Sequence, residues 1–499
     1  MLRRSMQPYL RFVVVVAVAA LLLCACSDDK PGADARPLDA RNESALDAPS
    51  DGGPDAPTGP PWVATLPPTA SLATHRGLRV VRTIVHSHSI SSHDACDGKP
   101  RLANDAPNEP CLQDLRAAVC ATRIDALMLT EHIDSLSKRP YAELLVQRDD
   151  DTLIKKAGSD VAVQMHCKNG HEALFVPGAE LNHSMPLGLE RHVAGAAADL
   201  PSIYSSIDPS LVPKLRDAGA VVMIAHTEQR KIDDLKAHGL DGIEIYNLHA
   251  NLDPNIRADF LGLPSFGYLD AIAPFASRKA NAPEPDLVFA AFFEEAKPSL
   301  DNWHALLAAG KMTGVAGTDA HQNVLDFKLR DGERLDSYRR MYRWFSNFVL
   351  VASPELDAIK DALRRGRSYV AFETYGTPTG FDFFVRANST VAEMGDEVAL
   401  ADAPTLSVAL PKLTSDSPQS ATAPEIALRV LRVDAAGMAH VVREGKPGEA
   451  ITDLALTDTG AYRVEVHITP HHLAPWLGED PSRYIAKKVW IYSNAIYVR

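Results

Sequence analysis

Residues 84–98, IVHSHSISSHDACDG, hold three histidines and two aspartates directly behind the apolar run 78–85. In an extended segment successive side chains point to opposite faces, so His86 and His88, two residues apart, project to the same side. Two imidazoles on one face can bind a single metal ion, but an isolated H-x-H motif is also common in a polar loop that follows a strand. The remainder of the chain has to distinguish these two interpretations.

Five further short apolar runs end as the first one does, each leading into a residue type that binds metals. Runs of this length, rich in Val, Ile and Leu, are typical of buried strands. Six such strand ends are difficult to explain as surface histidines alone. The residues concerned are Glu131 with His132, Glu180, His226, Glu244 with Asn247, and Asp319 with His321.

Helical patterns separate several of these runs. The alternation of strand and helix predicts a parallel sheet with crossover helices. In a closed α/β barrel the catalytic residues lie at the carboxyl ends of the strands, which is where the polar residues of this chain lie. We expect helices over residues 110–122, 211–218 and 299–309, and a fourth that opens with Ser353 as its cap and ends at Gly366.

These motifs, in this order, resemble those of the PHP superfamily, the polymerase and histidinol phosphatase metallohydrolases. The resemblance extends over residues 75–375 and implies a distorted (β/α)7 barrel, which the strand pattern alone does not distinguish from eight strands. Residues 242–247, GIEIYN, and 490–494, WIYSN, look closest to the secreted CehA/McbA-type branch. The matching motifs are His86-Ser87-His88, Thr130-Glu131-His132, Gly178-Ala179-Glu180, Ala225-His226 and Gly317-Thr318-Asp319-Ala320-His321.

The resemblance also implies a set of ligands. A further ligand is expected a few residues after the H-x-H motif, where we favour His93 over Asp94, and another after the glutamate motif, where we favour His192 over His183. Glu131 stands where the family usually has aspartate, and it should point away from the face that His132 shares. The predicted metal ligands are His86, His88, His93, His132, Glu180, His192, His226, Asp319 and His321.

A mixed set of imidazoles and carboxylates suits zinc, manganese or iron, and we expect two or three such divalent ions. Glu180 can bridge two of them. The ions would lower the pKa of a bound water to give hydroxide and would stabilise charge on a phosphoryl or carbonyl oxygen. The expected catalytic residues are Asp319, His321 and His226, with either histidine acting as a ligand or as the general acid.

Three functions are compatible with this set. The first, implied by the superfamily, is a phosphoesterase. The second keeps the metal site but cleaves a carboxylic ester, amide or carbamate; an amidohydrolase often has a strand-end lysine ligand, which this chain lacks. The third is an inactive lipoprotein that binds a surface partner, whose ligands should be eroded, whereas here they are intact apart from Glu131. In the enzyme cases the substrate is a small molecule or ester.

The beginning of the chain predicts export. Arg3, Arg4 and Arg11 precede the apolar stretch 12–26, which has the length of a signal peptide and is short for a membrane span of about 20 residues. Residues 23–26, LCAC, resemble a bacterial lipoprotein signal box with cleavage before a lipidated Cys26. Because serine and not aspartate follows Cys26, the resemblance favours the outer membrane.

Composition divides the rest of the chain. Residues 1–25 form the predicted signal peptide, and 26–61 are rich in Pro, Asp and Ala and cannot bury a core, which predicts a disordered tether. Residues 62–375 form the predicted metallohydrolase domain. The net charge of −13 and the pI near 5.8 argue against a nucleic-acid partner.

Residues 376–499 have alternating apolar patterns, such as 426–433 and 462–468, that predict a small immunoglobulin-like β-sandwich. Residues 458–462, DTGAY, resemble the tyrosine corner of such domains.

Four cysteines fall within the predicted folded part: Cys96, Cys111, Cys120 and Cys167. In an exported protein they predict two disulfides, with three possible pairings that the sequence does not separate. A zinc-cysteine site is the competing interpretation, and the lack of a C-x-x-C spacing argues against it.

Overall fold

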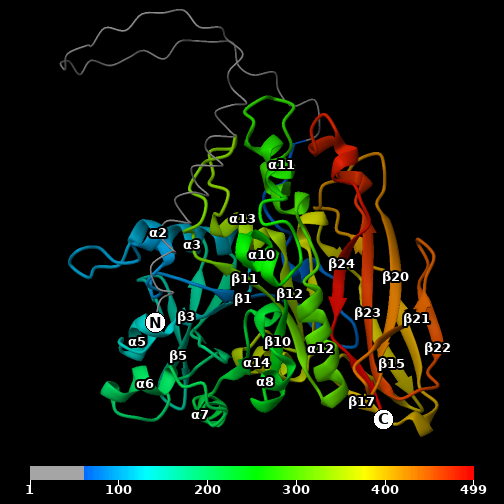
Figure 1. The fold of residues 1–499 in the computed structure, drawn as a ribbon, viewed down its shortest axis with the longest axis horizontal. Coiled ribbons are helices and arrows are strands. Elements are labelled where there is room, and N and C mark those ends of the chain that lie inside the picture. Colours follow the sequence, from blue (N-terminus) through cyan, green and yellow to red (C-terminus); the bar gives the residue numbers. More distant parts are fainter. Residues whose placement is uncertain (1–60) are drawn as a thin grey trace, which may run out of the picture.

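The computed structural model describes residues 61–499 as a mixed α/β protein built on one large sheet (Figure 1). The predicted signal peptide, nearly all of the predicted tether and the predicted lipid site at Cys26 lie outside the described residues. Among residues 61–499, no helix has both the length and the apolar character needed to cross a membrane.

Parallel strands form the centre of the sheet. β1 (Arg79–Ser87) pairs in parallel with β2 (Ala126–Leu129) on one side and with β11 (Thr313–Ala320) on the other. Beyond them, β6 (Glu172–Val176) pairs in parallel with β2, and β10 (Gly242–Asn247) with β11. Almost every residue of these strands is buried, as expected for strands that are covered on both faces.

The remaining pairings of this region lead back to β10. β8 (Met185–Leu187) forms a backbone bridge with Gly178 just beyond β6, and it pairs antiparallel with β9 (Val221–Met223). The amide of Glu244 in β10 then donates to the carbonyl of Ile224 just after β9, at 3.0 Å. Backbone hydrogen bonds therefore connect β1, β2, β6, β8, β9, β10 and β11 in a closed path.

The expected helices are present. α3 (Glu109–Ala121), α7 (Leu211–Asp217) and α12 (Lys297–Ala309) match the predicted segments. α14 (Leu356–Arg365) ends at Gly366, which has the left-handed conformation that favours glycine, with φ 78°. Its N-terminus differs from the prediction, because Glu355 and not Ser353 is the capping residue and no side chain caps the helix.

Strands of the C-terminal region continue the large sheet. β12 (Ser346–Val351) pairs antiparallel with β1, β13 (Ser368–Ala371) with β12, β24 (Lys488–Ser493) with β13, and β23 (Gly460–Thr469) with β24. The large sheet therefore continues across the predicted domain boundary at 375/376. Figure 1 shows these late strands alongside β12.

The last strands of the large sheet and the smaller sheets complete this region. In the predicted tyrosine corner, the Tyr462 hydroxyl donates to the carbonyl of Asp458 at 2.8 Å. The large sheet also contains β20 (Glu425–Val433), β21 (Ala439–Glu444), β17 (Glu397–Val398) and β25 (Ile496–Val498). A second sheet has the order β16 (Thr390–Ala392), β15 (Asp382–Ala387), β18 (Thr405–Ala409) and β22 (Ile451–Ala455). In a third, β14 (Pro378–Thr379) pairs with β19 (Lys412–Leu413).

The other elements are short or lie at the edge of the parallel region, where β4 (Thr152–Lys156) and β5 (Ser159–His166) extend the sheet from β6. The short helices are α2 (Ala95–Gly98), α4 (Ile133–Leu136), α5 (Tyr141–Leu144), α6 (Leu200–Tyr204), α8 (Ile232–Ala237), α9 (Leu248–Leu252), α10 (Pro254–Asp259), α11 (Leu269–Ile272) and α13 (Tyr338–Trp344).

Two disulfides select one of the three possible pairings. Cys96 is bonded to Cys111 and Cys120 to Cys167. Cys111 lies in the first turn of α3 and Cys120 in its last turn, so the two bridges attach opposite ends of one helix. The competing zinc-cysteine interpretation is therefore not supported.

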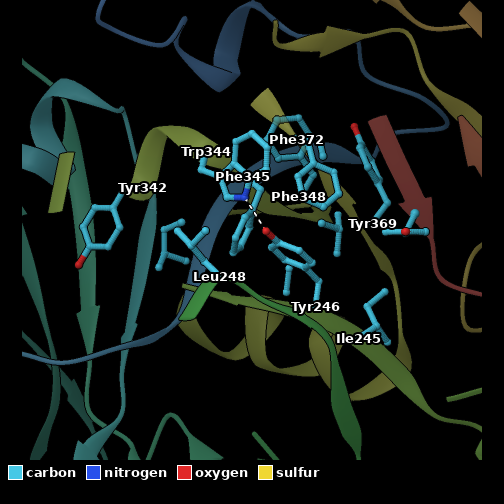
Figure 2. Close-up of a cluster of buried hydrophobic side chains, with 14 of the residues drawn as sticks. Ile245, Tyr246, Leu248, Tyr342, Trp344, Phe345, Phe348, Tyr369 and Phe372 are labelled. Carbon is cyan, nitrogen blue, oxygen red and sulfur yellow. Dashed lines mark hydrogen bonds between the residues drawn. The ribbon is translucent and has the colours of Figure 1, made fainter. Parts of the chain in front are cut away.

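An aromatic cluster joins the parallel strands to the C-terminal half (Figure 2). The Trp344 indole N–H donates to the Tyr246 hydroxyl at 3.0 Å, and the Tyr246 ring meets Phe345 and Phe372 edge to face. Such rings bury a large apolar area, and their edge-to-face contacts add about 0.5–1.5 kcal/mol per pair. The packing therefore ties β10 to β13 and α13.

A buried ion pair reinforces this junction. Arg82 of β1 donates two hydrogen bonds to Glu373, at 2.8 and 2.9 Å, and neither side chain is accessible to solvent. Glu373 also accepts from Ser346 and Thr377, at 2.6 and 2.8 Å. Every hydrogen-bonding need of the carboxylate is thus met inside the protein.

Removing one partner of this pair should destabilise the protein strongly. We expect Glu373→Ala to lower the free energy of unfolding by about 3–5 kcal/mol, because it leaves the Arg82 charge buried and unpaired. Glu397→Ala, which removes an exposed contact of 3.7 Å to Arg499, is the control and should change it by less than about 0.5 kcal/mol. Urea unfolding measures both, and equal effects would contradict this role for the pair.

Candidate metal centre

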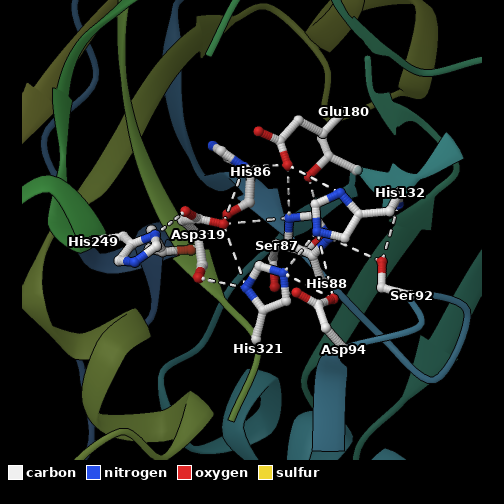
Figure 3. Close-up of polar contacts among 12 residues, drawn as sticks. His86, Ser87, His88, Ser92, Asp94, His132, Glu180, His249, Asp319 and His321 are labelled. Atoms are coloured by element: carbon white, nitrogen blue, oxygen red, sulfur yellow. Dashed lines mark hydrogen bonds and ion pairs between the residues drawn. The ribbon is translucent and has the colours of Figure 1, made fainter. Parts of the chain in front are cut away.

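Seven of the predicted ligands converge at the carboxyl ends of the parallel strands (Figure 3). Four of them, the mixed group, have ligand atoms that all lie within 4.8 Å of one another: His86, His88, Glu180 and Asp319. The same limit defines the histidine group: His88, His132 and His321. His226 completes the set by its contacts to the two carboxylates.

The Asp319 and Glu180 carboxylates face the histidine pair of β1 in the mixed group. Asp319 Oδ1 lies 3.2 Å from His86 Nε2 and 3.4 Å from His88 Nε2. Glu180 Oε2 lies 3.5 Å from His86 Nε2 and 3.6 Å from His88 Nε2. Two imidazoles and two carboxylates around one point form a suitable donor set for zinc, manganese or iron.

The histidine group shares His88 with the mixed group. The Nε2 atoms of His132 and His321 are 3.2 Å apart, and the ring of His88 stacks on that of His321 with centroids 3.7 Å apart. Asp94 Oδ1 lies 3.4 Å from His132 Nε2 and 3.5 Å from His321 Nε2. A carboxylate thus approaches this group from the loop after β1.

His226 and His249 approach from the other side. His226 Nε2 lies 3.0 Å from Glu180 Oε1 and 3.5 Å from Asp319 Oδ2. His249 Nδ1 lies 2.8 Å from Asp319 Oδ2. Each carboxylate therefore presents one oxygen to the mixed group and the other to this side, which is the arrangement of a bridging ligand.

Buried ligand atoms without hydrogen-bond partners show that the residues fit metal ions. Within the described residues, His86 Nε2, His88 Nε2, Asp94 Oδ1 and Asp319 Oδ1 are inaccessible to solvent and accept or donate no hydrogen bond. An unsatisfied buried polar atom costs about 1–3 kcal/mol and is rare in native proteins. Four such atoms converge here, and coordination of divalent ions would satisfy all of them.

The charges of the cluster are divided between acids and bases. Burial acts to raise the pKa of the Glu180 and Asp319 carboxyls, but neighbouring histidines, His86 foremost, hold both well below their usual range. Burial acts to lower the pKa of His86 and His226, yet the adjacent carboxylates raise both well above that of free histidine. Without metal, these two histidines are therefore protonated.

Backbone conformation aims three of the side chains. His86, His226 and Asp319 have left-handed backbones, with φ of 62°, 54° and 54°. Residues other than glycine rarely adopt this conformation, and it clusters at functional sites. At the end of β1 the register also shifts between Val85 and Ser87, which places the H-x-H motif on a bulge.

A buried carboxylate in β10 orients the first histidine. Glu244 Oε1 lies 2.5 Å from His86 Nδ1, and Glu244 Oε2 accepts from the amide of His226 at 2.9 Å. This bond fixes the ring so that Nε2 faces the mixed group, the usual role of a carboxylate behind a metal-binding histidine. A Cβ at Gly317 would lie 1.8 Å from Glu244 Oε1, so only glycine leaves room for it.

Glu131 organises the loop behind the centre. As predicted, its carboxylate does not face the metal groups; it accepts from the hydroxyls of Ser89 and Ser92 at 2.5 and 2.6 Å. Ser92 in turn lies 2.9 Å from His88 Nδ1 and accepts from the amide of His132 at 3.1 Å. β3 (Glu131–His132) and β7 (Ala179–Glu180), which pair in parallel, hold His132 beside Glu180.

Two predicted ligands do not join either group. Both ring nitrogens of His192 are used within the protein, Nε2 against the Arg139 carbonyl at 2.8 Å and Nδ1 against the Tyr204 hydroxyl at 3.1 Å. The ring of His93 lies 5.3 Å from that of His132, but His93 is exposed, and the neighbouring Asp94 supplies the carboxylate instead. The loop turns between these two residues, so consecutive side chains point in different directions.

Sequence reasoning did not find His249. His249 lies in α9, two residues beyond the end of β10. Its side chain is 36% exposed, which is more than that of any other histidine in contact with Glu180 or Asp319. The available signal was the polar end of that strand, where Asn247 had been noted. Asn247 instead caps α9 by accepting from the amide of Ala250.

Another acidic group, Asp286, Asp331 and Glu333, also meets the distance limit. Here arginines already supply the positive charge. Arg340 donates to Asp286 at 2.6 Å and to Asp331 at 2.8 Å, and Arg339 donates to Asp286 at 2.6 Å. This group is an ion-pair network and not a candidate metal site.

No model of a known protein family matches this chain, and no curated protein matches it either. Among solved structures, the chain is similar to a two-domain protein from Bacteroides vulgatus ATCC 8482 that contains a predicted PHP-like metal-dependent phosphoesterase. The two are 14% identical, with a TM-score of 0.33, over 84% of this chain and 97% of that one. A likeness this low carries no weight for function, which has to be inferred from the geometry of the centre.

The different positions of two histidines make a direct test of the ligand set. We expect His132→Gln to lower the affinity for manganese strongly, because it removes a ligand. The loss should exceed the factor of about 10–100 that is typical when a residue that orients a ligand is replaced. His192→Gln should leave the affinity unchanged, since both ring nitrogens of His192 contact Arg139 and Tyr204 and neither faces the centre. Equilibrium titration with Mn²⁺ measures both, and equal losses would contradict this assignment.

Metal binding should depend on pH. Because the pKa values of His86 and His226 are raised, both rings keep their protons until the pH rises well above that of free-histidine titration. A divalent ion must displace these protons, so its apparent affinity should increase as the pH rises from about 6 to 8. Calorimetry in buffers of different ionisation enthalpy measures the release, and an affinity independent of pH would contradict it.

Proposed function

We propose that this chain is a metal-dependent hydrolase of the PHP type that acts as a phosphoesterase. The observation that carries the proposal is the convergence of buried ligand atoms without hydrogen-bond partners on two overlapping groups. The closed path of strands supports the distorted (β/α)7 barrel that the resemblance implies, and the seven converging predicted ligands lie at strand ends, where such barrels place their catalytic residues.

Two or three divalent ions fit the centre. Such ions would supply Lewis acidity and lower the pKa of water in the pocket. The mixed group would hold one ion, and the histidine group, together with Asp94, would hold a second. His226 and the carboxylate oxygens of Glu180 and Asp319 that face it would provide ligands for a third. The Glu244 carboxylate keeps His86 in the orientation that binding requires.

The chain's own residues supply proton transfer and positioning. His226 is protonated in the metal-free centre, so its Nε2 can donate to a leaving oxygen where it is not used as a ligand. His321 has a lowered pKa, through burial first and the charge of His132 among other causes, so it can act as a neutral ligand or base.

A nearby cation favours phosphate esters over neutral esters. Arg230 follows His226 by four residues, and the carboxylates of Glu180 and Glu228 are close enough to raise its pKa, although burial lowers it overall. Its Nε atom is buried and has no hydrogen-bond partner among the described residues. The Arg230 guanidinium adds positive charge near the Glu180 carboxylate, which favours an anionic phosphate ester over a neutral ester.

The two disulfides support the proposed export, because structural disulfides persist in oxidising compartments outside the cytosol. We include the lipid anchor at Cys26 in the proposal on the basis of the signal box alone.

Replacing Asp319 tests the function. Asp319→Asn should reduce hydrolysis by more than about 100-fold while the fold persists, because the amide has nearly the same size but lacks the charge that neutralises a divalent ion. The assay compares aryl phosphate monoesters and diesters with aryl esters and carbamates, with added manganese or zinc.

The control is Asp301→Asn, at an exposed aspartate of α12 paired with Lys297, which should retain full activity. Activity on phosphates alone supports the phosphoesterase, and activity on esters or carbamates alone supports the alternative hydrolase. If Asp319→Asn matched the wild type on every substrate that the wild type hydrolyses, this centre would not be catalytic.

A further inference from the structure

The loop between β1 and α3 carries Asp94 into the centre. Asp94 Oδ1 is buried without a hydrogen-bond partner and lies 3.4 and 3.5 Å from the Nε2 atoms of His132 and His321. Among the described residues, Asp94 is the only carboxylate that forms ion pairs with both of these histidines. Asp94 lies in the loop and not at the end of a strand. Its position therefore depends entirely on the conformation of the loop.

Backbone hydrogen bonds attach this loop to the end of β11. The amide of Cys96 donates to the carbonyl of His321 at 2.9 Å, and the amide of Asp97 donates to the carbonyl of Gln322 at 3.0 Å. On the outer side, Arg334 holds the Asp97 carboxylate with two bonds of 2.8 and 2.9 Å. These bonds hold Cys96 and Asp97 of the loop against His321 and Gln322.

Local preference does not hold the loop in this conformation. Cys96 and Asp97 are both left-handed, with φ of 57° and 56°. This conformation costs roughly 1–2 kcal/mol for each residue that is not glycine. Two consecutive left-handed residues need an external restraint, since without it the chain would relax toward more favourable dihedral angles.

The disulfide from Cys96 to Cys111 in the first turn of α3 adds a covalent restraint to these hydrogen bonds. Both sulfur-bearing residues are buried, at 5% and 8% exposure. Asn108 caps this turn by accepting from the amide of Cys111, so the attachment point belongs to an ordered helix. The second bridge, Cys120 to Cys167, attaches the other end of α3 to the segment after β5, and none of its residues contacts the centre.

We propose that the Cys96–Cys111 disulfide is a positioning element of the metal centre, which holds the Asp94 carboxylate beside His132 and His321. Occupation of the histidine group by a cation then depends on the bridge being oxidised. This inference rests on the proposed metal centre and adds to it a dependence on redox state. Reduced and oxidised protein should differ in metal content, and the mixed group should be affected less because Asp94 does not contribute to it.

Removal of each bridge in turn tests the proposal. The full chain is compared with Cys96→Ala/Cys111→Ala and with the matched control Cys120→Ala/Cys167→Ala, which removes the bridge at the far end of the same helix. Elemental analysis and equilibrium titration with Mn²⁺ alone give the stoichiometry and affinity. Manganese is used because it prefers oxygen ligands to thiolates.

We expect the first variant to lose one ion per chain or about 10–100-fold in affinity for it, the range typical of residues that orient ligands. The control should retain wild-type binding. Equal losses in the two variants would overturn the proposal, because they would show a general effect on stability. A wild type that binds no metal would overturn the proposed function as well, whereas unchanged binding in the first variant would overturn this inference alone.

A cycle with Asp94→Asn separates positioning from folding. Asp94→Asn leaves the bridge intact and should reproduce the loss, and combining it with Cys96→Ala/Cys111→Ala should add little further loss, because both changes remove the same interaction. Losses that multiply independently would show that the bridge acts on the centre by another route and would overturn the proposal.

Chemical reduction gives a second measurement that does not require the alanine variant to fold. In the Cys120→Ala/Cys167→Ala protein only one disulfide remains in the described residues. A water-soluble phosphine cleaves it: the S–S bond breaks, each sulfur gains a hydrogen, and the phosphine takes the oxygen of one water to become its oxide. After the thiols are blocked, loss of the same ion supports the proposal, and full retention overturns it.

Discussion

The structure depends on one electrostatic constraint: imidazole nitrogens and carboxylate oxygens are buried together at 3.2–3.6 Å, and several of these atoms have no hydrogen-bond partner. Burial alone would favour neutral forms of all these groups, yet the Glu180 and Asp319 carboxyls stay ionised because protonated His86 balances them. Such a cluster is costly unless positive charge compensates it, and divalent ions do so more fully than protons. The supporting residues, Glu244 behind His86 and Glu131 behind the loop, serve to keep the ligand atoms convergent in spite of this cost.

Convergence was predictable for ligands at strand ends, because parallel strands carry their last residues to one edge. His86, His88, His132, Glu180, His226, Asp319 and His321 all follow buried apolar runs, and the structure brings all seven together. The predicted ligands differ from the residues that converge in the structure where the chain leaves the strands. His93 and Asp94 are adjacent in a turn that precedes the left-handed residues Cys96 and Asp97, and His192 lies in a loop that packs against Arg139 and Tyr204. Spacing along the sequence carries no information about direction in such segments.

The division of the chain was less predictable than its centre. Alternating patterns after residue 376 indicate strands correctly, but a period of two does not say which strand lies alongside. Tyr369 pairs with Ser493, more than a hundred residues later, and this pairing joins the last strands to the sheet of β1.

The C-terminal strands are part of the metal centre's scaffold for a specific reason. β11 ends in Asp319 and His321, and its pairing with β1 is confined to its last residues. Along the preceding stretch, side-chain amides take the place of a neighbouring strand. Asn494 donates to the carbonyl of Gly314 at 3.0 Å and accepts from its amide at 2.7 Å, and Asn347 makes the same two bonds to Ala316, both at 2.9 Å. An asparagine that follows β24 thus satisfies the backbone of the strand that delivers two ligands. The amide of Asn494 therefore fixes the position of β11, and β11 in turn fixes the position of the Asp319 carboxylate.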